Sequence, residues 1–405
     1  MMGLELTGKE PFNTIYLHGL IRQNDGKKMS KSRPEKAVDP LDMIDAYGCD
    51  ALRFYLITAG APGNDIKVEI KIGPDGKKQV ERIEGARNFA NKLWNATRFV
   101  IGKVSQVSEG SEVSTLSTPS TLGNAWITAR ANETIVNVRK LMDGYEYGEA
   151  GRLIYEFAWN DFCDWYVELA KLDFDHETAQ TAVAALDTIL RLLHPFMPFI
   201  TEELWQKLKE ATSGQFEVES LAYPALILAP FPTTDNGRRT TGASVVGGPS
   251  SVVSMNTLQD VIRVIRQARA DYKVAPDKKV AAIIVAGEHR ELLESQRAAI
   301  VMLAKVDDGA LTIAATATAP DKAVAQMLGD ITVYLPMAGL VDLEAEKKRL
   351  SDELAAMEQS IIKSESLLNS DFGKRAPPQV IEKEKAKMTD AQQKCVQLKE
   401  RLASM

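Results

Sequence analysis

Cysteine is scarce in this chain of 405 residues, which contains only Cys49, Cys163 and Cys395. Their odd number and irregular spacing exclude a disulfide framework and a cysteine-based zinc site. We therefore expect a protein of a reducing compartment that has no metal bound through cysteine.

Long hydrophobic runs are also lacking. No apolar stretch approaches the roughly 20 residues of a membrane-spanning helix, and Glu5, Lys9 and Glu10 interrupt the start of the chain. A signal or transit peptide does not fit such a start. The sequence predicts no membrane association and a cytoplasmic location, with an organelle matrix as the alternative in a eukaryote.

An excess of positive charge is the third thing the chain lacks, because its formal net charge is -6. Attraction of the whole molecule to a nucleic acid is thereby excluded, and any such binding must come from local basic patches. The length and the 45% of hydrophobic residues are enough for several apolar cores. We expect two to four domains.

The most informative segment that is present is Lys28-Met29-Ser30-Lys31-Ser32, which follows a predicted strand at Thr14–Leu17. Two lysines three residues apart on a loop can place ammonium groups beside the phosphates of a nucleotide, and serine hydroxyls can add donors. Asp25-Gly26 supplies a turn before the loop. The alternative interpretation is a solvated basic hairpin tip.

The rest of the chain divides into segments of different periodicity. We expect residues 1–60 to end in two helices. The first begins at Asp39-Pro40 and the second at Asp50. Residues 61–83 alternate in hydrophobicity around Gly73-Pro74-Asp75-Gly76 and predict an inserted hairpin. Residues 84–210 have helical periodicity and predict an α-helical bundle. Residues 211–254 have the Pro, Gly, Ser and Thr content of a linker.

The C-terminal third contains two further patterns. Residues 255–338 read as helix, strand, helix, strand and strand, which predicts a small α/β module. Residues 339–405 carry two heptad repeats separated by a turn at Asn369–Pro378. Two matched heptad arms predict an antiparallel coiled coil. The predicted fold class is a mainly α multidomain chain.

These segments resemble the class I aminoacyl-tRNA synthetases. The loop at Lys28–Ser32 matches the KMSKS signature of that family, within the surrounding sequences Tyr16–Arg22 and Asp39–Asp42. Three helical motifs, Asn91–Ala96, Trp159–Tyr166 and His194–Trp205, resemble the anticodon-binding domain of its valyl, leucyl and isoleucyl members. The run Tyr334–Glu344, followed by a two-stranded arm, is similar to the tRNA-binding arm of the valyl-tRNA synthetases.

The resemblance implies a reaction and its participants. Valine would be joined to its tRNA through valyl-adenylate, with ATP as substrate and Mg²⁺ expected, in a monomeric enzyme. Residues 1–60 would be the C-terminal end of a Rossmann-type catalytic domain. Lys28 and Lys31 would be catalytic, because pyrophosphate leaves with growing negative charge. The predicted ATP-binding residues are Lys28, Met29, Ser30, Lys31, Ser32 and His18.

The sequence also offers candidate tRNA contacts. Arg263, Arg266 and Arg269 share a helix face, and Lys374 and Arg375 lie at the predicted tip of the arm. A solvated helix face explains the three arginines equally well. The aromatic residues at 157–166 and His194 are better explained as core and helix boundary than as functional groups. His18 either lines the nucleotide pocket or ends the strand.

Two departures from the family limit the expected activity. Arg33-Pro34-Glu35-Lys36 replaces a basic residue followed by Gly-Asn after the signature, and Pro34 restrains a loop that should move. The His-Ile-Gly-His element of the other half of the ATP site is absent from the sequence, as are the editing insertion and the amino-acid pocket. We therefore expect the isolated chain to be inactive. The alternatives are a non-catalytic tRNA-binding protein, a subunit of a split enzyme, or a truncated gene model.

Overall fold

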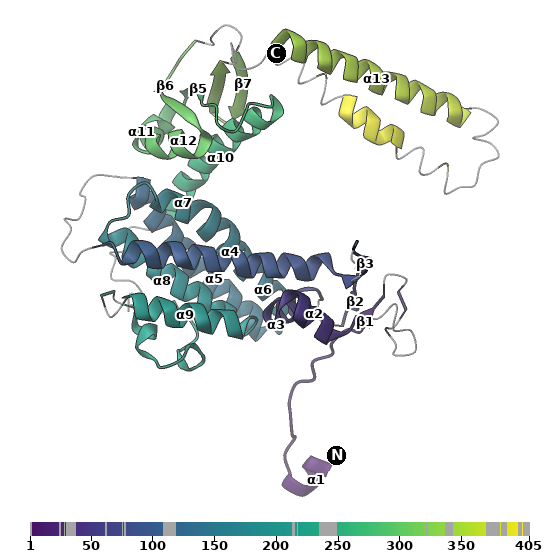
Figure 1. The fold of residues 1–405 in the computed structure, drawn as a ribbon, viewed down its shortest axis with the longest axis vertical. Coiled ribbons are helices and arrows are strands. Elements are labelled where there is room, and N and C mark those ends of the chain that lie inside the picture. Colours follow the sequence, from purple (N-terminus) through teal and green to yellow (C-terminus); the bar gives the residue numbers. More distant parts are fainter. Residues whose placement is uncertain are drawn as a thin grey trace. The chain divides into compact units, whose positions relative to one another are not determined.

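The chain folds into two units, Met1–Met255 and Asn256–Met405, each with its own apolar core (Figure 1). The structure is a computed structural model. It describes residues 2–23, 26–27, 29, 38–60, 63–74, 76, 78–107, 119–212, 215–216, 218–234, 249–318, 320, 323–336, 343–369, 381, 387–395 and 399. Most of the described residues are helical. No helix among them is long and apolar enough to cross a membrane.

The N-terminal part contains little sheet. A short helix α1 (Met2–Thr7) is followed by strand β1 (Ile21–Arg22), which pairs in parallel with β2 (Ile66–Lys67). The strand predicted at Thr14–Leu17 is wrong, because residues 14–20 have no regular structure. Ile15 and Leu17 are more than 70% exposed. A strand needs a neighbour to accept its hydrogen bonds, and no described strand lies beside this run.

Two helices follow the signature loop, α2 (Pro40–Tyr47) and α3 (Cys49–Thr58). The predicted cap of the first is confirmed, since the Asp39 carboxylate accepts a hydrogen bond from the Leu41 N–H. The predicted cap of the second is wrong. Asp50 lies inside α3, and its carboxylate accepts hydrogen bonds from Phe199 N–H at 3.4 Å and Ile200 N–H at 2.7 Å.

The expected hairpin is confirmed in its second half only. Strands β3 (Lys71–Ile72) and β4 (Lys78–Gln79) pair antiparallel around the turn at residues 73–76. Ile66, which we placed on the first hairpin arm, pairs with Ile21 instead.

The predicted helical bundle is present. Its members are α4 (Glu81–Val104), α5 (Pro119–Asp143), α6 (Tyr147–Glu156), the π-helical stretch η2 (Phe157–Tyr166), α7 (Val167–Ala170), α8 (His176–Leu193) and α9 (Pro198–Thr212). Apolar side chains at helical spacing fill the centre, as the periodicity predicts. They include Phe89, Leu93, Trp126, Ile135, Leu186, Ile189, Leu204 and Trp205.

The aromatic stretch 157–166 belongs to this core. Phe157, Phe162, Trp165 and Tyr166 are buried, as predicted. The Tyr166 hydroxyl lies 2.9 Å from Asn124 Oδ1 and 3.1 Å from the Thr178 carbonyl oxygen. His194 ends α8, also as predicted, and its Nδ1 lies 2.8 Å from Thr201 Oγ1.

The segment predicted as a linker is partly packed. Two 3₁₀ turns, η3 (Glu219–Ala222) and η4 (Leu226–Leu228), bury Leu221 and Leu226, and α10 (Pro249–Asp271) begins inside the predicted linker. The fully buried Asp187 carboxylate explains part of this packing. It accepts from the Ser220 hydroxyl at 2.7 Å, the Trp205 indole at 2.9 Å and Arg191 Nε at 2.8 Å. A buried charge requires such partners.

The second unit contains the expected α/β module. A four-stranded sheet has the order β6-β5-β8-β7, formed by β5 (Val280–Val285), β6 (Val306–Ala314), β7 (Ala323–Leu328) and β8 (Ile331–Pro336). Helices α10, α11 (Arg290–Ser295) and α12 (Arg297–Ala304) accompany it, after a 3₁₀ turn η5 (Gly287–His289). The sequence analysis missed β7, because its Ala-Val-Ala-Gln start gives a weak alternating pattern.

The segment with the first heptad repeat forms the helix α13 (Leu343–Asn369). Residues 387–395 are also helical. Lys399 Nζ lies 2.9 Å from the Glu358 carboxylate, so Lys399 lies beside α13. The predicted turn and the candidate contacts Lys374 and Arg375 lie outside the described residues.

Candidate functional site

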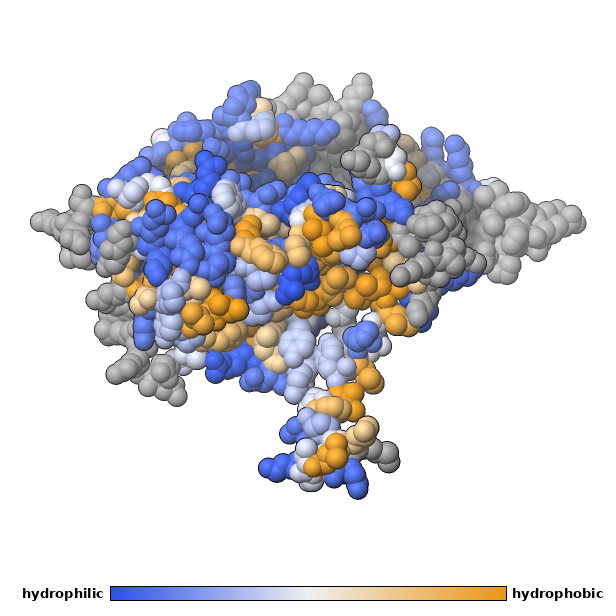
Figure 2. All heavy atoms as spheres, turned by 60° about the horizontal axis from the view of Figure 1, so that its bottom comes forward, coloured by the Kyte–Doolittle hydropathy of each residue, from blue (hydrophilic) through white to orange (hydrophobic). Residues whose placement is uncertain are grey.

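A cavity of about 640 Å³ lies next to the signature loop. Its walls come from residues 16–21 before the loop, from Met29 within it, and from α2, α3 and the β2 region after it. Most of the lining is apolar. It includes Leu52, Leu56, Ile66 and Val68 together with Tyr16 and His18. Figure 2 shows hydrophobic residues gathered above the projecting N-terminal segment of the same unit.

Two of the predicted ATP-binding residues meet in this cavity. His18 and Met29 both line it, although eleven positions separate them in the sequence. Lys28, Ser30, Lys31 and Ser32 lie outside the described residues, as does the departure at 33–36. The prediction for these positions therefore stays a prediction.

His18 presents one ring nitrogen to the backbone. Its Nδ1 lies 2.8 Å from the Gly19 carbonyl oxygen, which can only accept, so the proton of the neutral ring is on Nδ1. Nε2 is then the atom able to accept a hydrogen bond from a ligand. His18 lines the cavity, and β1 begins three residues later. A role of His18 in nucleotide binding stays a prediction.

Glycine is required at position 19 because the backbone there lies very close to the backbone of Asn64. A Cβ at this position would lie 1.7 Å from the Asn64 carbonyl oxygen, so no side chain fits. Beyond it, the Asp65 carboxylate accepts from the Leu20 N–H at 2.8 Å and pairs with Arg22. These contacts hold the cavity wall against β2.

Arg22 also reaches the start of the signature loop. One guanidinium nitrogen donates to the Gly26 carbonyl oxygen at 3.0 Å, while Nε faces Asp65. The Leu20 N–H and, after it, Arg22 lower the pKa of the Asp65 carboxyl, so the carboxylate stays charged. Asp65 is a residue that the sequence analysis missed, because no local motif surrounds it. It fixes Arg22, and Arg22 fixes the turn from which the loop begins.

A tyrosine cluster holds the other side of the cavity. The Tyr16 ring centroid lies 5.6 Å from that of Tyr147 and 6.5 Å from that of Tyr145. Tyr147 begins α6, so the cavity wall is attached to the helical bundle.

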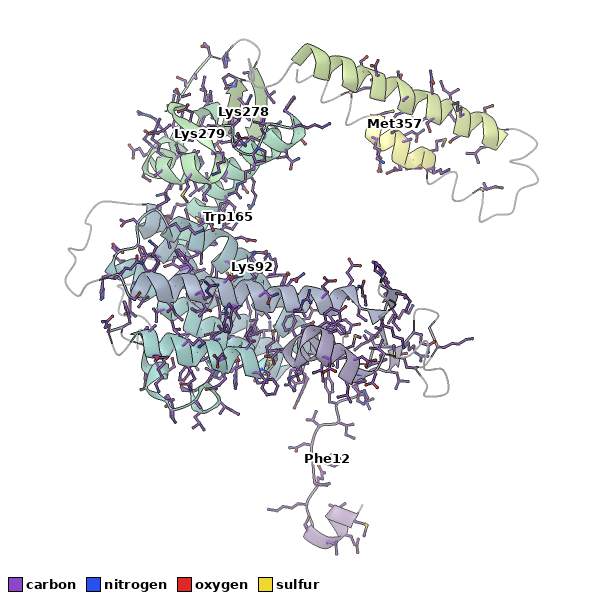
Figure 3. The ribbon with its side chains drawn as sticks, in the orientation of Figure 1. Phe12, Lys92, Trp165, Lys278, Lys279 and Met357 are labelled. Carbon is purple, nitrogen blue, oxygen red and sulfur yellow. The ribbon has the colours of Figure 1, made fainter. Side chains whose placement is uncertain are left out.

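Among the partly exposed aromatic residues of the bundle is Trp159. Trp159 stacks on Tyr155 with ring centroids 5.5 Å apart, and Lys92 Nζ lies 3.7 Å from the centre of the Trp159 ring. Lys92, labelled in Figure 3, also pairs with Asp164. Aromatic rings in this half-exposed position can stack on a nucleobase.

The three candidate arginines of α10 have different environments. Arg263 is exposed and pairs with Asp260 at 2.9 Å. Arg266 Nε donates to the Leu303 carbonyl oxygen at 2.8 Å. Arg269 is buried, and its guanidinium donates to the carbonyl oxygens of Lys305 and Ala275, both at 3.2 Å. Contacts of the last two arginines thus hold α10 against the end of α12. Arg263 and Arg266 are exposed, whereas Arg269 is buried.

No described residues form a cluster of three or more metal-ligating side chains.

Three family models match successive parts of the chain, in the order in which the segments were predicted. Residues 1–69 match the family of class I tRNA synthetases (I, L, M and V). Residues 124–284 match the anticodon-binding domain of tRNA ligases, and residues 342–405 match the valyl tRNA synthetase tRNA binding arm. Fold and matches together define a chain of the class I tRNA synthetases.

Curated relatives narrow the class. The valine–tRNA ligase of Symbiobacterium thermophilum is 38% identical over 424 residues, which cover 99% of this chain and 44% of the relative. That of Syntrophotalea carbinolica is 36% identical over 415 residues, and that of Geobacillus stearothermophilus 38% over 413, each covering 100% of this chain and 43% of the relative. The chain belongs to the valine–tRNA ligase family and corresponds to the C-terminal portion of its members.

The chain spans less than half the length of these relatives. It carries only a short fragment of the catalytic domain. A solved structure, the ternary complex of Agrobacterium radiobacter K84 agnB2 LeuRS–tRNA–LeuAMS, aligns with a TM-score of 0.40 and 20% identity, over 57% of this chain and 26% of that one.

Proposed function

We propose that this chain acts in the ATP-dependent ligation of valine to its tRNA through valyl-adenylate. The observation that carries the proposal is the cavity in which His18 and Met29 meet beside the signature loop. A site of adenylate chemistry needs a place for the nucleotide next to cations that meet the leaving pyrophosphate. Lys28 and Lys31 are those cations in the proposal.

The cavity is suited to one part of ATP in particular. Its walls are largely apolar, with Tyr16 and Met29 available to contact a flat ring and His18 Nε2 available to a polar edge. Such a mixture is typical of small-molecule sites. The base and ribose would lie in the cavity, while the phosphates would extend toward the loop.

The loop residues would act by electrostatics. Negative charge grows on pyrophosphate as the carboxylate of valine attacks the α-phosphorus, and ammonium groups placed there lower the barrier. Removal of one such donor typically lowers the rate roughly 10²–10³-fold. Mg²⁺ would arrive with the triphosphate and supply further positive charge. This chain's contribution is to position the loop through Arg22 and Gly26.

The remaining parts would bind the tRNA. In the proposal the helical bundle reads the anticodon, with Trp159 as the half-exposed ring, and the C-terminal segment is an antiparallel coiled coil. Support for the coiled coil comes from the Lys399–Glu358 ion pair and from the burial of Cys395. Arg263 and, at the predicted tip, Lys374 and Arg375 are the proposed phosphate contacts. Residues 1–60 would complete a Rossmann-type domain.

The first experiment measures nucleotide binding. A non-hydrolysable valyl-adenylate analogue should bind the purified chain in calorimetry, and His18→Ala should weaken it because Nε2 is lost. Arg22→Gln should also weaken it, by releasing the loop. Wild-type affinity in both variants would contradict the proposed nucleotide site.

The second experiment measures activity and tRNA choice. The chain alone should not catalyse valine-dependent pyrophosphate exchange, since the His-Ile-Gly-His element is absent from its sequence. It should nevertheless bind a tRNA for valine more tightly than a tRNA for another amino acid. A non-catalytic tRNA-binding role is not favoured, because the curated relatives covering the whole chain are valine–tRNA ligases. A monomeric state and a cytoplasmic location complete the proposal.

A further inference from the structure

The sheet of the second unit has one face that no described helix covers. Strand register places Thr312, Ile283, Tyr334 and Ala325 in one row across the four strands. The next row is Ala314, Val285, Thr332 and Met327. All eight side chains are half-buried or exposed, and Met327 is 78% exposed. We call these two rows the open face.

The opposite face is the one that forms the core. Ala282, Ile284, Val333 and Leu335 alternate with the open-face residues along their strands and are fully buried. Side chains of neighbouring strand residues point to opposite faces of a sheet. Ile262 and Ile265 of α10 and Ile300 of α12 are fully buried as well, and we infer that both helices pack on this face.

The open face is apolar and carries one aromatic ring on a central strand. Neither row contains a charged residue. Tyr334 lies between Ile283 and Ala325, and its hydroxyl has no hydrogen-bond partner among the described residues. An apolar patch that keeps an unpaired polar atom at a ring edge is suited to a flat ligand with hydrogen-bonding edges.

Unpaired cations lie at one end of the open face. Lys278 and Lys279, labelled in Figure 3, are exposed in the turn before β5 and form no ion pair with any described residue. Lys279 precedes Ala281 by two positions and Ile283 by four. Alternate residues of a strand point to the same face, so Lys279 is on the side of the open face, about 13 Å along the strand from Ile283. The carboxylates at this end are Asp277 in the turn and, on β6 beside the start of β5, Asp307 and Asp308, the last of which pairs with Arg297. At the other end, Asp330 is within 3.6 Å of His289.

We propose that the open face binds exposed nucleobases of the tRNA, which stack on Tyr334 while their phosphates contact Lys278 and Lys279. This inference rests on the proposed function and adds a contact separate from the bundle and the arm. Every nucleobase has an apolar face for stacking and a charged backbone beside it. The combination of an uncharged ring-bearing face with lysines at one end is complementary to that chemistry, and not to an acidic or a basic protein helix.

The test uses the full chain and a tRNA transcript, with affinity measured by fluorescence anisotropy at several salt concentrations. Tyr334→Ala should weaken binding about tenfold, because one stacked base is lost. Tyr334→Phe should keep most of the affinity, since it keeps the ring. Lys278→Gln with Lys279→Gln should reduce the slope of log K against log salt by roughly 1–2. Tyr223→Ala, which removes a half-exposed tyrosine of the first unit, is the matched control and should have no effect.

Met327→Glu is a second variant of the open face that should not disturb folding. This side chain is exposed, so the variant keeps its fold by circular dichroism, yet its carboxylate should repel a nucleic-acid backbone and weaken binding. A photo-crosslinking residue at position 327 should attach to unpaired nucleotides of the tRNA. Sedimentation of the same variants gives the oligomeric state.

The outcomes separate the two proposals. If the wild-type chain binds no tRNA, the proposed function fails and this inference fails with it. If the wild type binds but Tyr334→Ala, Met327→Glu and the lysine double variant bind equally well, only the open-face inference is overturned. A change in oligomeric state without a change in tRNA affinity would assign the face to a second copy of the chain and also overturn it.

Discussion

At the residue scale, Asp50 shows how a capping residue can act at a distance. Its carboxylate accepts from the N–H groups of Phe199 and Ile200 at the first turn of α9, although α9 lies about 150 positions further along the chain. Arg53, one turn later on α3, donates to the Pro195 carbonyl oxygen at 3.2 Å. The two contacts attach the helix after the signature loop to the helical bundle.

Loss of this cap should destabilise the first unit. We expect Asp50→Ala to lower the free energy of unfolding by about 1–2 kcal/mol, the usual cost of removing a cap. Urea denaturation followed by circular dichroism measures it. Asp39→Ala, which removes only the local cap of the short helix α2, is the control and should cost less. An equal loss in both variants would show that the contact with α9 contributes nothing beyond an ordinary cap.

The same carboxyl should make stability depend on pH. Burial raises the pKa of Asp50 above its ordinary value of 3.8, and hydrogen bonds from Ile200 and Phe199 lower it by less. The folded state therefore holds this proton more tightly than the unfolded state, and the stabilisation it gives declines as the pH rises through the raised pKa. The difference in free energy of unfolding between wild type and Asp50→Asn should fall as the pH rises from the ordinary value of 3.8 through the raised pKa of Asp50. A pH-independent difference would contradict it.

Cys163 should be chemically inert in the folded chain. Burial raises the pKa of its thiol to about 12, so almost no thiolate exists at neutral pH. Iodoacetamide at about pH 8 should label the half-buried Cys49 and leave Cys163 unmodified until the chain is denatured. Mass spectrometry of the peptides distinguishes the two. Equal labelling under native conditions would mean that the packing around Cys163 opens readily.

At the scale of elements, the glycines of α4 and α6 have opposite roles. In α4, a Cβ at Gly85 or Gly102 would meet no atom within 4 Å. In α6, a Cβ at Gly148 would lie 2.9 Å from the Gly60 carbonyl oxygen, and one at Gly151 would lie 2.7 Å from Thr58 Cγ2. The α6 glycines therefore allow the close approach of α3.

Alanine substitutions should separate the two cases. Gly85→Ala should stabilise the chain by about 0.5–1 kcal/mol, because alanine loses less backbone entropy in a helix. Gly151→Ala should destabilise it by roughly 1–3 kcal/mol through overpacking against Thr58. Both values come from urea unfolding curves. Stabilisation by Gly151→Ala would show that α3 and α6 can separate without cost.

At the scale of the whole molecule, the two units have separate cores. Two-state unfolding is an approximation that holds for single small domains. We expect calorimetry to show more than one transition, and Trp205→Ala, in the core of the first unit, should lower only one of them. A single transition that shifts as a whole would mean that the two units unfold together.

Local sequence patterns were enough to predict the helical bundle, the α/β module and the family. Helical periodicity depends only on the spacing of apolar residues, and these residues are buried where it predicted. The signature at Lys28–Ser32 and the C-terminal heptads are likewise patterns of the local sequence. Such patterns involve neighbours within a few turns of the chain, so no tertiary structure is needed to recognise them.

The long-range contacts could be identified only in the folded chain. The cap from Asp50 to α9, the Asp65–Arg22–Gly26 chain and the pairing of Ile21 with Ile66 join positions without a shared local motif. The open face of the sheet also depends on strand order and register, in which the unpredicted β7 supplies Ala325 and Met327. Hydrogen bonds between distant segments form only after the chain has brought them together, and no local pattern specifies which segments those will be.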